Sequence, residues 1–196
     1  MILTKEEIRQ IVAQRKQTLT DTQTPSQRII ERLTTLREMS TANIIMTYVD
    51  FGKEARTVPM IAELLQKNRQ VVVPYCEHNE IRLFLLKNLN ELAPGYFGIL
   101  EPKIELRGLS KHKIRAEELQ VIIVPGIAFD SNGGRLGRGV GYYDRFLRKL
   151  PETVTTIGLS FDCQIFDKVP MQENDCFLKI IVSETKTFYA KNVMTS

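Results

Sequence analysis

The feature of this sequence that most restricts its fold is an apolar run followed at once by a glycine-rich stretch. The run Gln120-Val-Ile-Ile-Val-Pro125 holds four consecutive β-branched residues and closes on Pro125-Gly126. Neither face of such a strand carries polar residues, which is typical of a strand covered on both sides. The run therefore predicts an α/β fold, with helices on both faces of a mostly parallel central sheet.

The rest of the chain alternates between helical and strand patterns, as such a sheet requires. Thr4 and Glu7 predict a capping box at the start of a first helix, and Pro25 is suited to the first turn of a second. We expect further helices over 59–67 and 142–150, strands over 43–49, 70–74, 81–86, 120–125, 153–159 and 178–182, and a polar tail at the end. The length of 196 residues predicts one domain over residues 1–196.

Composition and cysteine usage favour a globular protein of the cytoplasm. Hydrophobic residues make up 43% of the chain and charged residues 26%, which argues against disorder. No apolar run approaches the ~20 residues of a membrane span, and the polar N-terminus shows no signal core. Cys76, Cys163 and Cys176 are odd in number and lack C-x-x-C spacing. We expect free thiols in a cytoplasmic protein, not a disulfide frame or a zinc site.

The net charge of +4 raises the question of a nucleic-acid partner. Positive and negative residues are interleaved, and no block of five like charges occurs. This pattern favours a surface that attracts small anions. We therefore expect no nucleic-acid partner. We also expect no membrane partner and a monomer or weak homodimer, although this pattern does not itself set the oligomeric state.

Glycines gather directly after the apolar run. Five of the chain's 11 glycines lie between residues 133 and 141, and Gly137, Gly139 and Gly141 alternate with larger residues. A backbone without side chains lets successive N–H groups converge on an anion. The expected helix after the loop adds the positive end of its dipole, and Arg135 and Arg138 add forked donors suited to phosphate. The loop is thus a candidate phosphate site.

This candidate site matches neither common phosphate loop. Tyr142 stands where a dinucleotide fingerprint needs its third glycine, and no Gly-Lys-Ser/Thr occurs anywhere. Asp144, one helical step further on, could hold a magnesium ion that bridges phosphates. A glycine-rich turn packed tightly on the sheet is the alternative, but it leaves the two interleaved arginines unexplained.

The same stretch carries a family resemblance. Residues 124–130 and 135–147 (VPGIAFD and RLGRGVGYYDRFL) resemble the signature of the 5-formyltetrahydrofolate cyclo-ligases. Further segments similar to the family follow its order along the chain: Lys5-x-x-x-Arg9, Glu54-Ala-Arg-Thr57, Gly98-Ile-Leu-Glu-Pro102, Val169-Pro170 and Glu173-Asn-Asp175. The resemblance implies an enzyme that uses ATP and Mg²⁺ to close 5-formyltetrahydrofolate into 5,10-methenyltetrahydrofolate, releasing ADP and phosphate. It also implies a fold related to the ribose-phosphate isomerase and CoA-transferase group.

The resemblance implies a role for particular residues. Arg138 and Asp144 would be catalytic, and Asp144 and Asp175 would hold the metal. The residues that would bind ATP are Lys5, Arg9, Arg135, Leu136, Gly137, Arg138, Gly139, Val140, Gly141, Tyr142 and Tyr143. Those that would bind the folate are Val49, Glu54, Arg138, Gly139, Val140, Gly141 and Tyr142.

Several of these residues have a plainer interpretation. Lys5 and Arg9 could form the solvated face of a helix. Glu54 could cap the helix that follows it, and Asp175 could be an ordinary loop acid. Of Tyr142 and Tyr143, one is expected in the core and one at the ligand. The ring residues Phe84, Tyr96 and Phe97 could stack on the substrate or pack in the core.

Three positions depart from the family pattern. Val140 stands where Gly or Lys is usual, Arg56 replaces an acid, and Gln120 replaces a common Asp. Two alternative functions stay open from the residues alone. One is a non-catalytic sensor of a sugar phosphate or nucleotide, which would need the loop but not Asp144. The other is a basic nucleic-acid binder, which would need a basic stripe with stacking aromatic residues.

Overall fold

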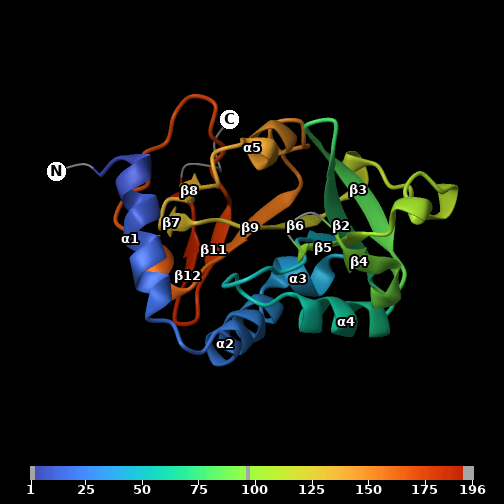
Figure 1. Ribbon diagram of the computed structural model, residues 1–196, viewed down its shortest axis with the longest axis horizontal. Coiled ribbons are helices and arrows are strands. Elements are labelled where there is room, and N and C mark those ends of the chain that lie inside the picture. The colour runs from blue at the N-terminus through green and yellow to red at the C-terminus, as the bar shows by residue number, and fades with distance from the viewer. Residues whose placement is uncertain (1–2, 96–97, 192–196) are drawn as a thin grey trace.

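The structure is a computed structural model that describes residues 3–95 and 98–191. Its helices are α1 (Lys5–Gln17), α2 (Gln23–Thr34), α3 (Arg37–Thr41), α4 (Val58–Gln66) and α5 (Tyr142–Leu147). Its strands are β1 (Ile44–Thr47), β2 (Gln70–Glu77), β3 (Glu80–Leu86), β4 (Leu92–Pro94), β5 (Leu100–Pro102), β6 (Val121–Val124), β7 (Ala128–Asp130), β8 (Arg135–Leu136), β9 (Thr155–Leu159), β10 (Ile165–Phe166), β11 (Ile180–Val182) and β12 (Thr187–Tyr189). Figure 1 shows their arrangement.

A seven-stranded sheet in the order β12-β11-β9-β6-β1-β2-β3 forms the centre of the molecule. The five inner strands run parallel, and only the edge strands β3 and β12 pair antiparallel with their neighbours. This confirms the predicted α/β fold with a mostly parallel sheet. None of the helices within residues 3–95 and 98–191 has the length and apolar character of a bilayer span.

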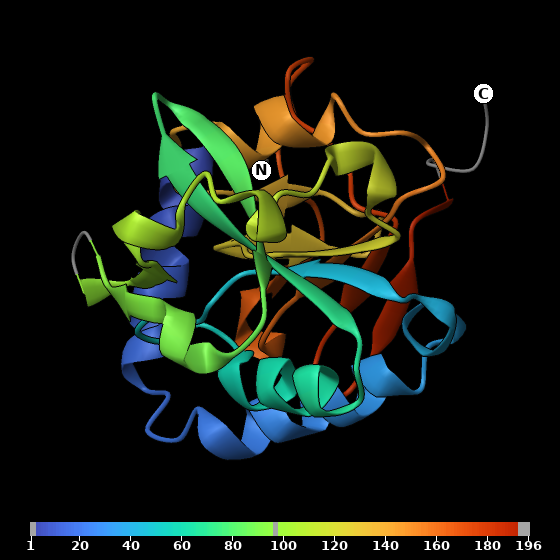
Figure 2. The same ribbon diagram turned by 90° about the vertical axis from the view of Figure 1, so that its right-hand side faces the viewer.

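Side chains of β6 alternate between two apolar layers, as its β-branched run predicts. Val121 and Ile123 pack in the core layer that contains residues of α2, α3 and α4. Ile122 and Val124 pack in the opposite layer, together with Phe146 of α5. All four side chains of the strand are almost fully buried. Figure 2 shows α5 on one side of the sheet and α4 on the other.

The direction in which successive strands are added to the sheet reverses at β1. From β1 the chain passes through α4 to β2 on one side, whereas β6 pairs with β1 on the other side. At such a switch point the connections leave the carboxyl ends of two neighbouring strands in opposite directions, which opens a crevice between them. The segments after Thr47 and Val124 are therefore placed to line a binding site.

Helix α1 packs against a small sheet of order β10-β7-β8, apart from the main sheet. Ile8 and Val12 of α1 share an apolar cluster with Leu136 of β8 and Phe166 of β10. The predicted capping box is confirmed, because Thr4 accepts from the Glu7 N–H and the Glu7 carboxylate accepts from the Thr4 N–H. This packing sets the first turns of α1 beside the glycine-rich loop.

Three expectations about secondary structure were wrong. Residues 135 and 136 belong to a strand, β8, that pairs with β7, so the loop begins only at Gly137. The tail contains strand β12, because Thr187-Phe188-Tyr189 is rich in residues that favour strands and Phe188 packs on the core. Helix α5 ends at Leu147, three residues early, since Pro151 disfavours helix before it and the chain tightens into i→i+3 bonds.

Candidate active site

A cleft of about 860 Å³ opens at the switch point, between the carboxyl ends of β1 and β6 and the side of α1. Every residue that the sequence assigns to ATP, folate or metal lies on its wall. These residues are Lys5, Arg9, Val49, Glu54, Arg135, Leu136, Gly137, Arg138, Gly139, Val140, Gly141, Tyr142, Tyr143, Asp144 and Asp175. Segments that are up to 170 residues apart in the chain thus meet in one cavity.

The glycine-rich stretch divides into a structural part and a cleft part. A Cβ atom on Gly133 would lie 2.1 Å from the carbonyl oxygen of Leu178, so only glycine fits there. Gly133 therefore belongs to a tightly packed turn, the alternative to a phosphate site that the sequence left open. Gly139 has φ +101 and lies on the cleft wall, where a Cβ would meet nothing closer than the Arg9 guanidinium at 3.4 Å. Only the stretch from Gly137 onward is therefore free to follow a ligand.

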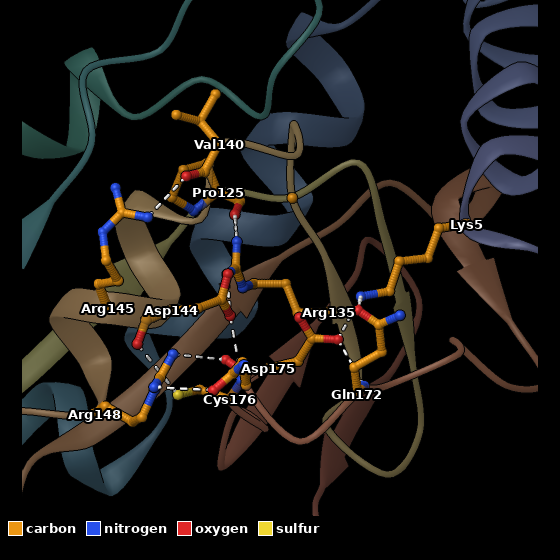
Figure 3. Close-up of polar contacts among 12 residues, drawn as sticks. Lys5, Pro125, Arg135, Val140, Asp144, Arg145, Arg148, Gln172, Asp175 and Cys176 are labelled. Carbon is orange, nitrogen blue, oxygen red and sulfur yellow. Dashed lines mark hydrogen bonds and ion pairs between the residues drawn. The ribbon is translucent and has the colours of Figure 1, made fainter. Parts of the chain in front are cut away.

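Arg135 is not the free phosphate donor that its place in the motif suggests. Its side chain is 3% exposed and donates from Nη2 to Asp144 Oδ1 at 2.8 Å and from Nη1 to the Pro125 carbonyl at 3.3 Å. Figure 3 shows the guanidinium between these two partners. Its Nε is buried without a partner among the described residues. Arg135 thus ties Asp144 to the end of β6.

Lys5 pairs with Asp175 across the same cleft. Its Nζ lies 2.5 Å from Asp175 Oδ2 and 3.4 Å from Gln172 Oε1 (Figure 3). Burial raises the pKa of Asp175, but hydrogen bonds from Lys5 and the Gln172 N–H, with the charges of Lys5 and Arg135, outweigh it and lower the pKa. The Lys5 side chain is 25% exposed, so it is not part of a solvated helix face.

Arg138 pairs with Glu54 at the other side of the cleft, with Nη2 and Oε1 2.8 Å apart. The second oxygen of Glu54 accepts from the Phe51 N–H at 3.1 Å. Glu54 does not cap α4, because the carboxylate that accepts from the first N–H groups of that helix belongs to Asp50. Arg9 donates to the Gly137 carbonyl at 3.4 Å and so joins α1 to the loop.

Sequence reasoning missed the apolar part of the cleft wall. The apolar and aromatic residues there come mostly from the ends of β1, β2 and β5: Tyr48, Phe51, Tyr75, Ile81, Ile99 and Leu100. The hydroxyl of Tyr48 donates to the Ala55 carbonyl at 2.9 Å, and burial raises the pKa of this phenol. No motif marks this wall in the sequence, because strand order decides which residues follow the switch-point strands and line the crevice.

The two adjacent tyrosines have different surroundings. Tyr143 packs against the core cluster on the α5 side, and burial raises its pKa, with a smaller contribution from Glu54. Tyr142 donates to Asn79 Oδ1 at 3.3 Å and lies against the Arg145 guanidinium. Both rings also border the cleft. Tyr143 therefore has the expected core contact, but which of the two rings meets a ligand stays a prediction.

Asp144 and Asp175 suit a magnesium ion that is also held by a nucleotide. Asp144 uses Oδ1 to accept from Arg135 and the Cys176 N–H, and Asp175 uses Oδ2 to accept from Lys5 and Gln172. The second oxygen of each accepts no hydrogen bond from the described residues. Within that part of the chain, no group of three or more His, Cys, Asp or Glu is arranged for a metal. Magnesium in nucleotide sites takes one or two carboxylates with phosphates and water, so the two carboxylates fit.

The departures from the family pattern have separate outcomes. Gln120 uses Oε1 to accept from the N–H groups of Asn43 and Ile44, which joins β6 to the start of β1. The side chain of Arg56 donates to Thr22, the residue before α2, and does not line the cleft. Val140 does line it, with 56% of its surface exposed.

Phe84 packs in the core and is not placed to stack on a substrate. Its ring stacks on buried His112, with centroids 4.2 Å apart, and packs in the core. Tyr96 and Phe97, which we considered with it, lie outside the described residues. All three cysteines lie within the described residues and are free, as predicted.

The fold and the cleft define the class as α/β enzymes that bind a small molecule at the switch point of a mostly parallel sheet. A model of the 5-formyltetrahydrofolate cyclo-ligase family matches residues 2–184. The chain belongs to this family. The 5-formyltetrahydrofolate cyclo-ligase of Escherichia coli K12 is 30% identical over 184 residues, which cover 91% of this chain and 99% of that protein.

Solved structures agree with the family match. The 5,10-methenyltetrahydrofolate synthetase of Aquifex aeolicus has a TM-score of 0.82 and 28% identity, covering 99% of this chain and 96% of that one. A 5,10-methenyltetrahydrofolate synthetase from Mycoplasma pneumoniae has a TM-score of 0.72 over 93% of this chain and 99% of its own, and at 21% identity it shows the fold alone.

Family membership settles the choice among the functions left open by the sequence. The protein is an ATP-dependent ligase that converts 5-formyltetrahydrofolate into 5,10-methenyltetrahydrofolate. The sensor and the nucleic-acid binder are therefore set aside.

Proposed function

We propose that the cleft binds both substrates, with the triphosphate of ATP between the glycine-rich stretch 137–141 and α1, and the folate against the apolar wall. The single observation that carries this proposal is the meeting of all the assigned residues in one cavity at the switch point. Lys5, Arg9 and Arg138 supply positive charge to the cleft. Glu54, which pairs with Arg138, supplies acceptors for the N–H donors of a 2-amino-4-oxo pterin, and Val49 lines the same cleft.

The reaction must overcome the low reactivity of the formyl group. Its carbonyl is a poor electrophile, because the ring nitrogen to which it is attached donates electrons into it. In our proposal the formyl oxygen attacks the γ-phosphorus of ATP, a new O–P bond forms, and the bond from that phosphorus to the bridging oxygen breaks. ADP leaves, and the formyl carbon becomes part of an iminium-like phosphate ester.

Ring closure completes the reaction. The nitrogen at position ten of the folate attacks the activated carbon, the carbon–oxygen bond breaks, and inorganic phosphate leaves with the bonding electron pair. Loss of the proton from that nitrogen gives the 5,10-methenyl cation. The overall products are 5,10-methenyltetrahydrofolate, ADP and phosphate, so atoms and charge are accounted for.

The protein contributes position and charge in this scheme. Lys5 and Arg138 bind phosphate oxygens and neutralise charge that develops during transfer, which makes Arg138 a catalytic residue. Asp144 and Asp175 would hold Mg²⁺, which neutralises phosphate charge when bound. Arg135 holds Asp144 in place through its buried guanidinium. The apolar wall excludes water from the activated ester, which would otherwise hydrolyse back to the formyl compound.

The test is an absorbance assay with purified protein. We expect 5-formyltetrahydrofolate, Mg²⁺ and ATP to give the near-ultraviolet absorption of the methenyl product at a rate proportional to protein concentration. Omission of ATP, or its replacement by ADP, should abolish the signal. Folded protein that binds ATP and yields no methenyl product would contradict the proposal.

Three coarser predictions accompany this mechanism. One domain over residues 1–196 is supported by the main sheet, which draws its strands from both halves of the chain. A cytoplasmic location is supported by the free thiols, which persist in reducing compartments. The third prediction is that the protein is a monomer or a weak homodimer. Size-exclusion chromatography with light scattering measures its mass in solution and so tests this.

A further inference from the structure

Arg138 and Glu54 form an ion pair between residues that serve different substrates in the proposed function. Arg138 Nη2 lies 2.8 Å from Glu54 Oε1. The resemblance assigns Arg138 to both ATP and folate, but in the proposed function its guanidinium binds the triphosphate, whereas Glu54 is assigned to the pterin alone. Two other ion pairs, Lys5–Asp175 and Arg135–Asp144, also join two assigned residues. Each of them links a residue assigned to ATP with a residue assigned to the metal. Among the described residues, only the Arg138–Glu54 pair links the proposed nucleotide and pterin contacts.

Each partner of this pair is able to change its contact. The Arg138 side chain is 62% exposed and stands between Gly137 and Gly139, so its guanidinium can be redirected at small cost. The Glu54 side chain is only 19% exposed, and its Oε2 stays anchored by the Phe51 N–H at 3.1 Å. When the Arg138 guanidinium turns away, Oε1 of Glu54 therefore stays in place and lacks a hydrogen-bond donor.

We propose that this pair exchanges partners when substrates bind. The phosphates of ATP take the Arg138 guanidinium, and the released Oε1 of Glu54 accepts from an N–H donor of the pterin. This inference rests on the proposed function. Because either substrate binds better once the pair is broken, ATP and 5-formyltetrahydrofolate raise each other's affinity by the same factor. The weakness of exposed ion pairs sets that factor at about two- to fivefold.

The test replaces Glu54, which has no assigned contact with ATP. In Glu54→Gln the Arg138 guanidinium has lost its ionic partner and is released more easily, so the affinity for the magnesium complex of AMP-PNP, measured by titration calorimetry, should rise about two- to fivefold. Glu101→Gln is the matched control, because Glu101 lines the same cleft but pairs with Arg107 at 3.0 Å. An affinity in Glu54→Gln no higher than in wild type, or an equal gain in both variants, would overturn the exchange.

A second measurement on the wild-type protein does not depend on the folding of a variant. The affinity for 5-formyltetrahydrofolate should rise about two- to fivefold when magnesium AMP-PNP is saturating. No rise would overturn the exchange. The absorbance assay separates this outcome from failure of the proposed function, since an enzyme that forms product without this coupling refutes the exchange alone.

Discussion

The Arg135 guanidinium donates to Oδ1 of Asp144 across 2.8 Å, with the arginine side chain 3% exposed and the aspartate 16%. The two residues stand nine positions apart, one on β8 and the other on α5. Arg138, three positions after Arg135, is by contrast 62% exposed. Two arginines of one motif therefore have different tasks, one inside the wall of the cleft and one at its surface.

Removal of Arg135 should destabilise the protein, and removal of Arg138 should not. Arg135→Ala leaves a buried carboxylate without its partner and should lower the free energy of unfolding by about 3 kcal/mol. Arg138→Ala breaks an exposed pair and should lower it by less than about 1 kcal/mol. Urea denaturation of both variants checks this, and equal losses would contradict the division.

Turnover should depend strongly on the charges at the proposed phosphate site. Arg138→Ala and Asp144→Asn should each lower the rate of methenyl formation by at least ~10²-fold, because each loses stabilisation of transition-state charge. Lys87→Ala, at an exposed position that is not among the residues lining the cleft, is a suitable control and should keep wild-type turnover. Near-native rates in both site variants would remove the loop from the mechanism.

The Lys5–Asp175 pair should make stability depend on pH in the acid range. The folded state lowers the pKa of Asp175, so its contribution is complete above the ordinary aspartate pKa of about 3.9 and is lost as pH falls through the lower folded value. Asp175→Asn should therefore lower the free energy of unfolding by about 1–2 kcal/mol at pH 7.

This difference from wild type should shrink as pH falls below about 4, where the wild-type carboxylate also becomes neutral. Glu173→Gln, at an exposed neighbouring position, should show neither effect. Denaturation curves at a series of pH values measure both, and a difference that stays constant down to pH 2 would show that the charge of Asp175 is not what stabilises the fold.

The two parts of the glycine-rich stretch should respond differently to alanine. Gly133→Ala places a Cβ against the Leu178 carbonyl and should cost about 2 kcal/mol or more in unfolding free energy. Gly139→Ala meets only the strain of its positive φ and should cost about 1 kcal/mol. Its larger effect should be on ATP affinity. Thermal unfolding measures the stability of each variant, and nucleotide titration measures its affinity for ATP. A larger stability loss in Gly139→Ala than in Gly133→Ala would contradict this prediction.

Long periodic segments made the fold predictable from sequence. The β-branched run of β6 and the alternation around it predicted a sheet covered on both faces, because a strand pattern of this kind can be buried in few other ways. Strands of two or three residues, such as β8 and β12, were missed since their pairing is set by partners distant in the chain.

The site was predictable in membership but not in geometry. The motif and the resemblance named residues that do line one cleft. That Arg135 is buried against Asp144 could not be predicted, because its burial depends on the β7–β8 hairpin and on α5 packing beside it. The apolar wall around Tyr48 was missed because it follows from strand order, which a single sequence does not contain.

In the proposed mechanism the triphosphate lies between α1 and residues 137–141. A crystal structure with AMP-PNP, Mg²⁺ and 5-formyltetrahydrofolate would show whether it does. We predict phosphate oxygens within hydrogen-bond distance of Lys5 and Arg138, and the formyl oxygen facing the γ-phosphorus. A nucleotide bound elsewhere, with the formyl group distant from its phosphates, would contradict the account.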